Sequence, residues 1–302
     1  MRLKHRARAA CALAAALWVS SPSAGAQAPV RVTDDAGQPV TLVTPARRIV
    51  SLAPHLTEIL FAAGAGSRVV GVSAYSDYPA ATRGLPRVGS ALQVNLERLL
   101  ALEPDLVAAW ASGTPRTTVD RLRALGIAVF VSEPRRLEDI ATTMRRLGAL
   151  AGSAGDAARA ADDFLADLSA LRSRFHSRAP VSVFFEIEHR PLMTLGGSHV
   201  FNDVLEACGG RNVFAEINVL APAVGLEAVL ARNPDVILVS GSLSGIADVL
   251  ASWRLRTELS AARSGHVHAL PADLVVRHGP RLLDGARIVC ELLEAARAGR
   301  GD

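Results

Sequence analysis

The chain has 302 residues, enough for one large domain or two modest ones, and half of them are hydrophobic, so a sizeable core is possible. The formal net charge is +4, from 33 basic and 29 acidic side chains. Four of the basic residues and none of the acidic ones lie in the first 26 residues. Since 33 less 4 is 29, the rest of the chain is neutral and gives no indication of a nucleic-acid partner.

The N-terminal segment has the order of a secretory signal peptide. "MRLKHRAR" is basic, "AACALAAALWV" is apolar, and Ala24-Gly25-Ala26 is a small-x-small cleavage signal. The apolar run is too short to span a bilayer. We predict a signal peptide over residues 1–26, cleaved near Ala26, and a periplasmic mature chain. Cys11 lies at the start of the apolar run instead of after it, which argues against a lipid anchor.

The mature chain keeps two cysteines, Cys208 and Cys290. An even pair in a compartment that oxidises thiols predicts a structural disulfide. The stretch "EACGG" has no second cysteine or histidine at metal-ligand spacing, so we predict no zinc site.

From residue 48 onward, strand-like stretches alternate with helical patterns. "RIVSL" is followed by "TEILFAAGAG", in which Thr57 is suited to cap a helix and Gly64 to end it. "RVVGVS", "LVAAWAS" and "IAVFVSE" are further strands, with "NLERLLALEPD" and "TVDRLRALG" as the intervening helices. This alternation predicts a parallel sheet flanked by helices.

Residues 137–178 contain two helical patterns with no strand between them, and the second is either a surface helix or a spar between two lobes. An internal repeat favours the spar. "NLERLLALEPDLVAAW" and "GLEAVLARNPDVILVS" share Leu, Glu, Leu, Ala, Pro and Asp at the same offsets. We therefore predict an α/β fold of two Rossmann-like lobes with parallel sheets, over residues 27–150 and 180–302, joined by a backbone helix over residues 151–179.

Both tyrosines of the chain, Tyr75 and Tyr78, lie in "VSAYSDYP", directly after a predicted strand. Loops at the carboxyl ends of strands line the cleft between two such lobes, which is the usual ligand position. The rings either contact a ligand there or cover the edge of the lobe, and residue chemistry alone does not decide between these alternatives. Trp110 ends the strand "LVAAW", so its ring could also contact a ligand in the cleft, whereas Trp253 is more typical of core packing.

The sequence lacks the common catalytic motifs: there is no G-x-S-x-G, P-loop, G-x-G-x-x-G or H-E-x-x-H. His55 and His189 fall in predicted loops, and His266 and His268 alternate as on a strand. We predict no catalytic site, no metal site and no resident cofactor. A secreted metal-dependent hydrolase stays the alternative from another class, because distant His, Asp and Glu residues could still converge.

Several motifs resemble those of a known family. "RIVSLAPHLTEILFAAGAGSRVVGVSAYSDYP", "NLERLLALEPDLVAAW" and "ACGGRNVF" are similar to the periplasmic cobalamin-binding proteins of ABC importers. These belong to the helical-backbone class of substrate-binding proteins, which also serves siderophores and haem. The resemblance implies a monomer that captures cobalamin or a related corrinoid between its lobes and delivers it to a membrane permease, without catalysis.

The resemblance also implies roles for individual residues. Tyr75 would lie against the corrin ring, with Tyr78 as support and Trp110 nearby, and a loop of the second lobe would contact the ligand through Asp273, Leu274, Val275, Val276 and Arg277. Glu97 and Glu227 occupy the same slot of the repeat and would dock onto arginines of the twofold permease dimer. Cys208 and Cys290 match the disulfide of the family.

One departure from the family leaves the ligand open. Relatives commonly place tryptophans against the ligand at positions that correspond to Ala91 and Ala221. Haem or a ferric siderophore is therefore the alternative ligand, and for haem an axial ligand would come from Tyr75, Tyr78 or His55.

Overall fold

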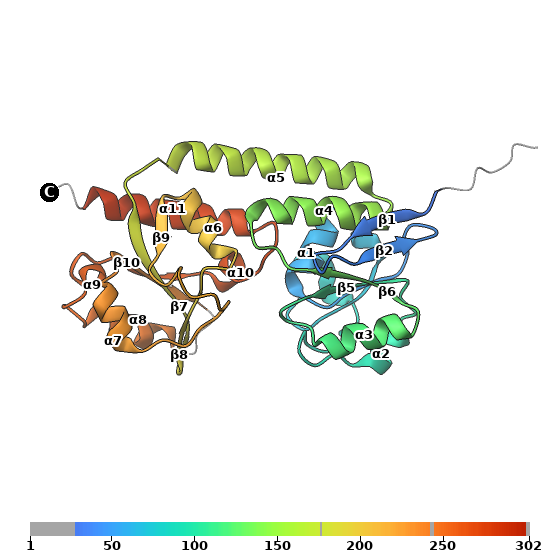
Figure 1. Cartoon of the computed structure of the whole chain (residues 1–302), viewed down its shortest axis with the longest axis horizontal. Coiled ribbons are helices and arrows are strands. Elements are labelled where there is room, and N and C mark those ends of the chain that lie inside the picture. The colour runs from blue at the N-terminus through green and yellow to red at the C-terminus, as the bar shows by residue number, and fades with distance from the viewer. Residues whose placement is uncertain (1–27, 176, 242–244, 300–302) are drawn as a thin grey trace, which may run out of the picture.

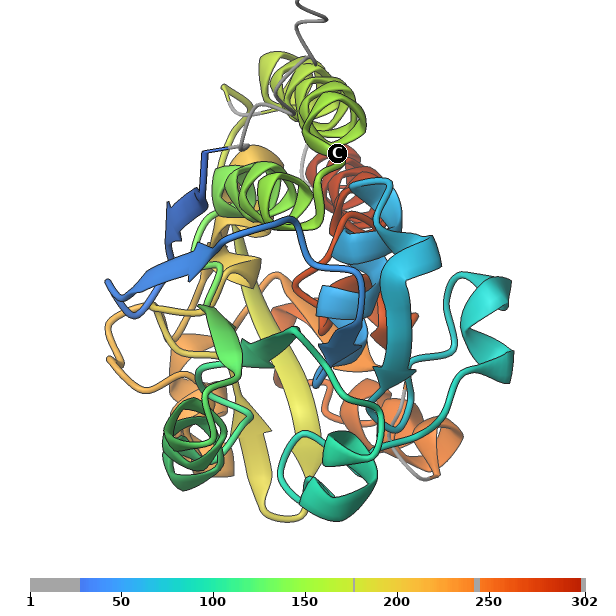
Figure 2. The ribbon, with the colours of Figure 1, turned by 90° about the vertical axis from the view of Figure 1, so that its right-hand side faces the viewer.

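The computed structural model describes residues 28–175, 177–241 and 245–299, so the predicted signal peptide lies outside the described part of the chain. Two α/β lobes sit side by side beneath a long helix, α5 (Ala154–Phe175) (Figure 1). Turned by 90°, the first lobe lies in front of the second (Figure 2). The predicted fold class, two α/β lobes joined by a long helix, is confirmed.

The first lobe is built on a four-stranded sheet of order β4-β3-β5-β6, in which every pair is parallel. An antiparallel hairpin, β1–β2, lies outside it. The elements of this lobe are β1 (Val30–Thr33), β2 (Pro39–Leu42), β3 (Ile49–Ser51), α1 (Pro54–Ala62), η1 (Gly66–Arg68), β4 (Val69–Val72), η2 (Ala80–Gly84), α2 (Leu96–Leu100), β5 (Leu106–Trp110), α3 (Arg116–Ala124) and β6 (Ala128–Ser132). Both faces of the sheet are covered, which agrees with the burial of every residue of β3 and with the apolar run in β5.

Helix α1 begins earlier than its capping pattern predicts. It starts at Pro54, a residue suited to the first helical turn because its backbone lacks an N–H, and Thr57 lies inside the helix. The predicted cap at Thr57 is therefore wrong, since its buried hydroxyl instead donates to Ser51 Oγ. The predicted stop is confirmed: Gly64 has a φ of 73°, which glycine adopts without a steric penalty.

The two helices predicted between the lobes are α4 (Leu137–Ala151) and α5. Helix α5 packs on α1 and α4 of the first lobe and on α6 (Phe201–Ala207) and α11 (Leu282–Ala298) of the second, as a spar would. One apolar cluster runs through both lobes by way of α4 and α5. The exact lobe boundaries at residues 150 and 180 stay a prediction.

The second lobe has a five-stranded sheet of order β11-β10-β7-β8, and β9 pairs with the first residues of β7, on the edge opposite β10. It is not purely parallel as predicted, because the short β8 returns antiparallel to β7. Its elements are β7 (Val181–His189), β8 (Leu192–Thr194), α6, β9 (Gly210–Asn212), α7 (Leu226–Arg232), β10 (Val236–Ser240), α8 (Ile246–Arg254), α9 (Ser260–Arg263), β11 (Val267–Leu270), α10 (Ala272–Val275) and α11. The predicted disulfide is present: Cys208 at the end of α6 is bonded to Cys290 in α11.

The internal repeat corresponds to the same local structure in each lobe. In the first copy α2 leads into β5, and in the second copy α7 leads into β10. Glu103 and Asn233, at the same slot, both have left-handed backbones, with φ of 44° and 41°. Asp105 accepts backbone N–H bonds from Arg47 and Arg48, and Asp235 accepts one from Ser182, which ties each unit to the start of a neighbouring strand.

Candidate functional site

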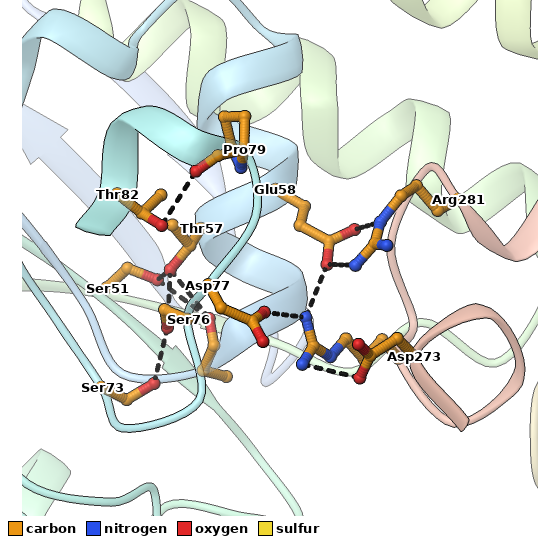
Figure 3. A network of polar contacts seen from close by, with 12 residues as sticks. Ser51, Thr57, Glu58, Ser73, Ser76, Asp77, Pro79, Thr82, Asp273 and Arg281 are labelled. Atoms are coloured by element: carbon orange, nitrogen blue, oxygen red, sulfur yellow. Dashed lines mark hydrogen bonds and ion pairs between the residues drawn. The ribbon is translucent and has the colours of Figure 1, made fainter. Parts of the chain in front are cut away.

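A hydrogen-bonded turn after β4 holds the two tyrosines; we call residues 73–78 the tyrosine turn. Thr57 Oγ1 lies 2.9 Å from Ser51 Oγ and 3.2 Å from Ser76 Oγ, and Ser76 Oγ lies 3.1 Å from Ser73 Oγ (Figure 3). All four hydroxyl groups belong to buried residues. The tyrosine turn is therefore anchored to β3 and α1 through its serines, which leaves the tyrosine rings outside.

Tyr75 is the outward-facing residue of this turn. Its φ of 63° lies in the left-handed region that non-glycine residues rarely adopt, and 78% of its surface is exposed. The guanidinium of Arg87 donates to the carbonyl of Ser76 at 2.6 Å and to that of Ser73 at 3.3 Å, which holds the backbone on both sides of Tyr75. Such over-determined strain is typical of residues that present a side chain for function.

Tyr78 has a different position. The guanidinium of Arg281, from the second lobe, lies over its ring at 4.1 Å from the centroid, and 47% of the residue is exposed. Tyr78 also lines a cavity of about 390 Å³ between the lobes, together with Glu58, Phe61, Pro280 and Arg281. It thus contributes to the contact between the lobes, whereas Tyr75 projects from it.

The inner part of this contact is a network of ion pairs centred on Glu58, which is only 3% exposed. Its carboxylate accepts from Arg281 Nε at 3.0 Å and Nη2 at 2.6 Å, and from Arg277 Nη1 at 3.2 Å. Arg277 also pairs with Asp77 at 2.8 Å and with Asp273 at 2.7 Å (Figure 3). Both arginines of the second lobe are therefore already bound to carboxylates.

The pKa shifts follow from these pairs. The hydrogen bond from Arg277 lowers the pKa of Asp77, and the hydrogen bond to Glu58 raises the pKa of Arg281. Both shifts stabilise the charged forms of Asp77 and Arg281, and the ion pairs join opposite charges across the contact.

Beside the ion pairs, a cluster of rings joins the lobes; we call it the ring cluster. His55 and Trp110 come from the first lobe, and His278 and His199 from the second. His55, Trp110 and His278 lie 5.4 to 5.7 Å apart, centroid to centroid, and His199 Nε2 is 3.2 Å from His278 Nε2. Within the described residues, His55 Nε2, Trp110 Nε1 and His278 Nδ1 are buried and have no hydrogen-bond partner.

Four residues of this contact were not predicted from the sequence: Glu58, His199, His278 and Arg281. They meet partners that are far away along the chain, as Arg277 and Glu58 do across 219 positions. One signal was available for the histidines: His55 and His199 both lie at the start of the helix that follows a strand in their lobes.

The predicted ligand segment of residues 273–277 divides in two. It is partly helical, since α10 covers Ala272–Val275, and is not the loop that was expected. Val275 is fully buried in the core, and its predicted contact with a ligand stays a prediction. Asp273 and Arg277 lie at the contact with the tyrosine turn, Leu274 is half-buried, and Val276 is exposed.

Large exposed apolar side chains occur on both lobes near the predicted ligand positions. Ala91 and Ala221 are half-buried, but each has an exposed apolar neighbour, Leu92 in the first case and Val219 in the second. Tyr75 and Val276 add to this set. Exposed apolar surface of this kind is typical of binding sites.

Glu97 and Glu227 lie in the first turns of α2 and α7. Both are exposed, and neither forms an ion pair with a residue in the described ranges. Helices α2 and α7 lie on the side of the molecule opposite α5, one on each lobe (Figure 1). The two carboxylates are therefore presented in equivalent positions on one side.

Three further histidines of the described residues, His189, His266 and His268, lie in the second lobe. His189 Nδ1 lies 2.6 Å from the buried carboxylate of Glu186, whereas His266 directly precedes β11 and His268 lies within it. Among the residues that the structure describes, no three His, Cys, Asp or Glu side chains are placed to hold a metal ion. No helix in the described ranges combines the length and apolarity needed to cross a membrane.

Comparisons with known proteins agree with this fold. The family model for periplasmic binding proteins matches residues 49–274. The chain is 38% identical to the vitamin B12-binding protein of Vibrio cholerae serotype O1, over 84% of this chain and 91% of the relative. It is also 38% identical to the vitamin B12-binding protein of Yersinia pestis, over 82% of this chain and 86% of the relative.

Solved structures give the same picture. The crystal structure of the periplasmic vitamin B12-binding protein BtuF of Vibrio cholerae matches with a TM-score of 0.78 at 39% identity, covering 84% of this chain and 98% of that one. The periplasmic haem-binding protein HutB of Vibrio cholerae matches with a TM-score of 0.71 at 25% identity, covering 82% and 98%. The extent of the family match and the identity to these relatives show that this chain belongs to the family of periplasmic binding proteins.

Proposed function

We propose that this chain is a periplasmic binding protein that captures cobalamin, or a related corrinoid, between its lobes and delivers it to an ABC importer. The observation that carries the proposal is the 38% identity to vitamin B12-binding proteins over most of both chains. Haem-binding relatives share the fold at lower identity. The protein binds without catalysis and acts as a monomer in the periplasm.

The chemistry of the contact between the lobes supports a neutral ligand. Haem carries two propionates, which need cationic partners when they leave water. Arg277 and Arg281 are already paired with Glu58, Asp77 and Asp273, so neither is available without breaking an ion pair. The amide side chains of a corrinoid carry no charge, so they do not require a cationic partner.

Tyr75 and its exposed apolar neighbours would cover the face of the corrin ring. An exposed tyrosine held in place by its backbone provides apolar area at a low cost in conformational entropy. Val276 and Val219 would approach the ligand from the second lobe.

Delivery would use Glu97 and Glu227. A permease dimer with twofold symmetry presents its cations in matched pairs, and the repeat gives this chain a matched pair of exposed carboxylates. The capping alternative explains one glutamate near a helix start, but does not explain why both are exposed and unpaired at the same slot of two copies.

A calorimetric titration of the mature protein with cyanocobalamin, dicyanocobinamide and haemin tests the ligand. We expect saturable binding of the corrinoids, with cobalamin retained after gel filtration, and weaker binding of haemin. A Soret shift with stoichiometric haemin, and no corrinoid retained, would make haem the ligand. If the protein bound neither the corrinoids nor haemin, the proposal would be overturned.

A further inference from the structure

The ring cluster lies where the two lobes meet, and its hydrogen bonds specify where the protons are. The backbone N–H of Phe201 donates to His199 Nδ1 at 3.1 Å, so that nitrogen carries no proton. The proton of His199 is therefore on Nε2, which donates to His278 Nε2 at 3.2 Å. The proton of His278 is then on Nδ1, which is buried without a partner. Both rings are neutral in this arrangement.

A further proton does not fit into this arrangement. A proton on His278 Nε2 would point at the N–H of His199, and a proton on His199 Nδ1 would point at the N–H of Phe201. His55 Nε2 has no acceptor within reach in the described residues. His55 and His278 are 4% and 3% exposed, so water does not replace the missing acceptors.

The charged groups around the cluster do not compensate either. Those at the contact between the lobes are Glu58 and Asp77 of the first lobe and Asp273, Arg277 and Arg281 of the second. Every one of these carboxylates is bound to an arginine. Arg277 adds a positive charge next to His55.

The pKa values agree with the geometry. Burial lowers the pKa of His278 to about 4 and, with a smaller contribution from His278, that of His199 to about 3. Burial, His278 and Arg277 together lower the pKa of His55 well below its ordinary value. When the lobes separate, these rings reach water and their pKa values return towards 6.5.

We propose that the ring cluster is a proton-sensitive latch between the lobes, which closes only around neutral imidazoles, so that proton uptake favours opening and release of the ligand. This inference rests on the proposed function in one respect, namely that the ligand binds between closed lobes. The sign follows from the direction of the shifts: the contact is fully available above pH 6.5 and weakens as the pH falls from 6.5 towards 4.

The test is the affinity for cyanocobalamin, measured by calorimetry at pH 7.5, 6.0 and 5.0. One histidine with a pKa near 6.5 in the open state, and about 4 in the closed state, lowers the affinity about 30-fold at pH 5.0. We expect at least that loss, and proton uptake on ligand release when buffers of different ionisation enthalpy are compared. An affinity that does not change between pH 7.5 and 5.0 would overturn the latch.

Two variants make the test specific. The triple variant His55→Gln, His199→Gln, His278→Gln keeps polar side chains but cannot be protonated, so its affinity should be nearly constant over this range. The control is His268→Gln in β11, because His268 Nε2 is also buried without a partner and burial also lowers its pKa, but it lies away from the contact. The control should keep the pH dependence of the wild type; a flat profile for the control, or a steep one for the triple variant, contradicts the latch.

A second measurement separates this inference from the ligand assignment. Small-angle X-ray scattering of the ligand-free protein should show a larger radius of gyration at pH 5.0 than at pH 7.5, and no such change in the triple variant. If the triple variant does not fold, His278→Gln alone should serve instead: its proton uptake on ligand release should be about one proton lower than that of the wild type. Failure to bind cobalamin at pH 7.5 overturns the proposed function only, whereas an unchanged radius in the wild type overturns the latch.

Discussion

Tyr75 combines a strained backbone with an exposed ring, and the strain is maintained by the buried serines and Arg87 around it. Such an arrangement costs about 1–3 kcal/mol and persists only where the surroundings enforce it. Since Ala91 and Ala221 have no rings to contribute, the Tyr75 ring is the main aromatic surface that a ligand would meet outside the ring cluster.

We expect Tyr75→Ala to weaken cyanocobalamin binding about 10- to 100-fold, because the loss of one buried aromatic side chain costs about 1.5–3 kcal/mol. Tyr75→Phe is the matched control, since it keeps the ring and should bind within a few-fold of the wild type. If Tyr75→Phe loses binding as fully as Tyr75→Ala, the hydroxyl group is the contact, as an axial ligand to haem iron would require. Calorimetry of both variants distinguishes these outcomes.

Glu58 is the residue on which the charge balance of the contact depends. Glu58→Gln leaves Arg281 without its carboxylate, and breaking a buried ion pair in this way costs up to about 3–5 kcal/mol. We expect urea unfolding to show a lower free energy of unfolding for this variant. We also expect its affinity for haemin to rise relative to that for cobalamin, because the guanidinium of Arg281 becomes available. Asp120→Asn, which removes an exposed pair with Arg116, should change the stability by less than about 1 kcal/mol.

For individual residues, the sequence predicts where a side chain lies in the fold better than which other residues it contacts. Tyr75, Tyr78 and Trp110 were identified because they follow strands, and the carboxyl ends of parallel strands share one edge of a sheet. The partners of Glu58 and His55 could not be identified in this way, because they lie on the other lobe. The burial of Val275 could not be predicted either, because it follows from the one-turn helix α10, which turns this side chain into the core.

Among the elements, α4 and α5 pack so closely that their contact requires a glycine. A Cβ on Gly148 would lie 2.1 Å from the Cβ of Ala157, so the helices are in contact at a point where any side chain collides. The same pair joins the core of the first lobe to that of the second. The packing of α4 against α5 therefore determines how the two lobes are positioned relative to each other.

We expect Gly148→Ala to lower the free energy of unfolding by about 1–3 kcal/mol, despite the better helix propensity of alanine, because the extra methyl group forces α4 and α5 apart. Gly155→Ala in α5 is the control: only the end of the Arg159 side chain lies near its Cβ position, and it should be neutral or stabilising. Thermal unfolding of both variants, followed by circular dichroism, measures the difference. If both variants changed the stability equally, the close contact between α4 and α5 at Gly148 would not be the cause of the effect.

The elements themselves could largely be predicted, because the repeat and the alternation of strands and helices determine them locally. The start of α1 and the direction of β8 could not. Thr57 is a good capping residue, but its hydroxyl group is hydrogen-bonded to Ser51 of β3 and Ser76 of the tyrosine turn, and this depends on tertiary structure. Strand β8 is only three residues long, and its pairing follows from the β7 hairpin and not from its composition.

For the whole molecule, the duplicated lobes place α2 and α7, whose first turns contain Glu97 and Glu227, on the side away from α5 (Figure 1). We expect Glu97→Lys with Glu227→Lys to abolish stimulation of the importer's ATPase in proteoliposomes while cobalamin affinity stays unchanged. Asp162→Lys with Asp167→Lys on α5 changes the charge equally on the opposite side and should preserve stimulation. Loss of ligand binding in the first variant would show that these glutamates belong to the ligand site.

The apolar cluster that passes from one lobe to the other through α4 and α5 has a consequence for unfolding. Lobes that share a core and the spar helix cannot melt one at a time, so the chain should unfold as one cooperative unit despite its two-lobe shape. Differential scanning calorimetry should give a single endotherm whose van't Hoff and calorimetric enthalpies agree, and two separable transitions would contradict this. A ligand bound between the lobes would then raise the melting temperature of the entire chain, which makes a simple thermal-shift assay a valid screen for the natural corrinoid.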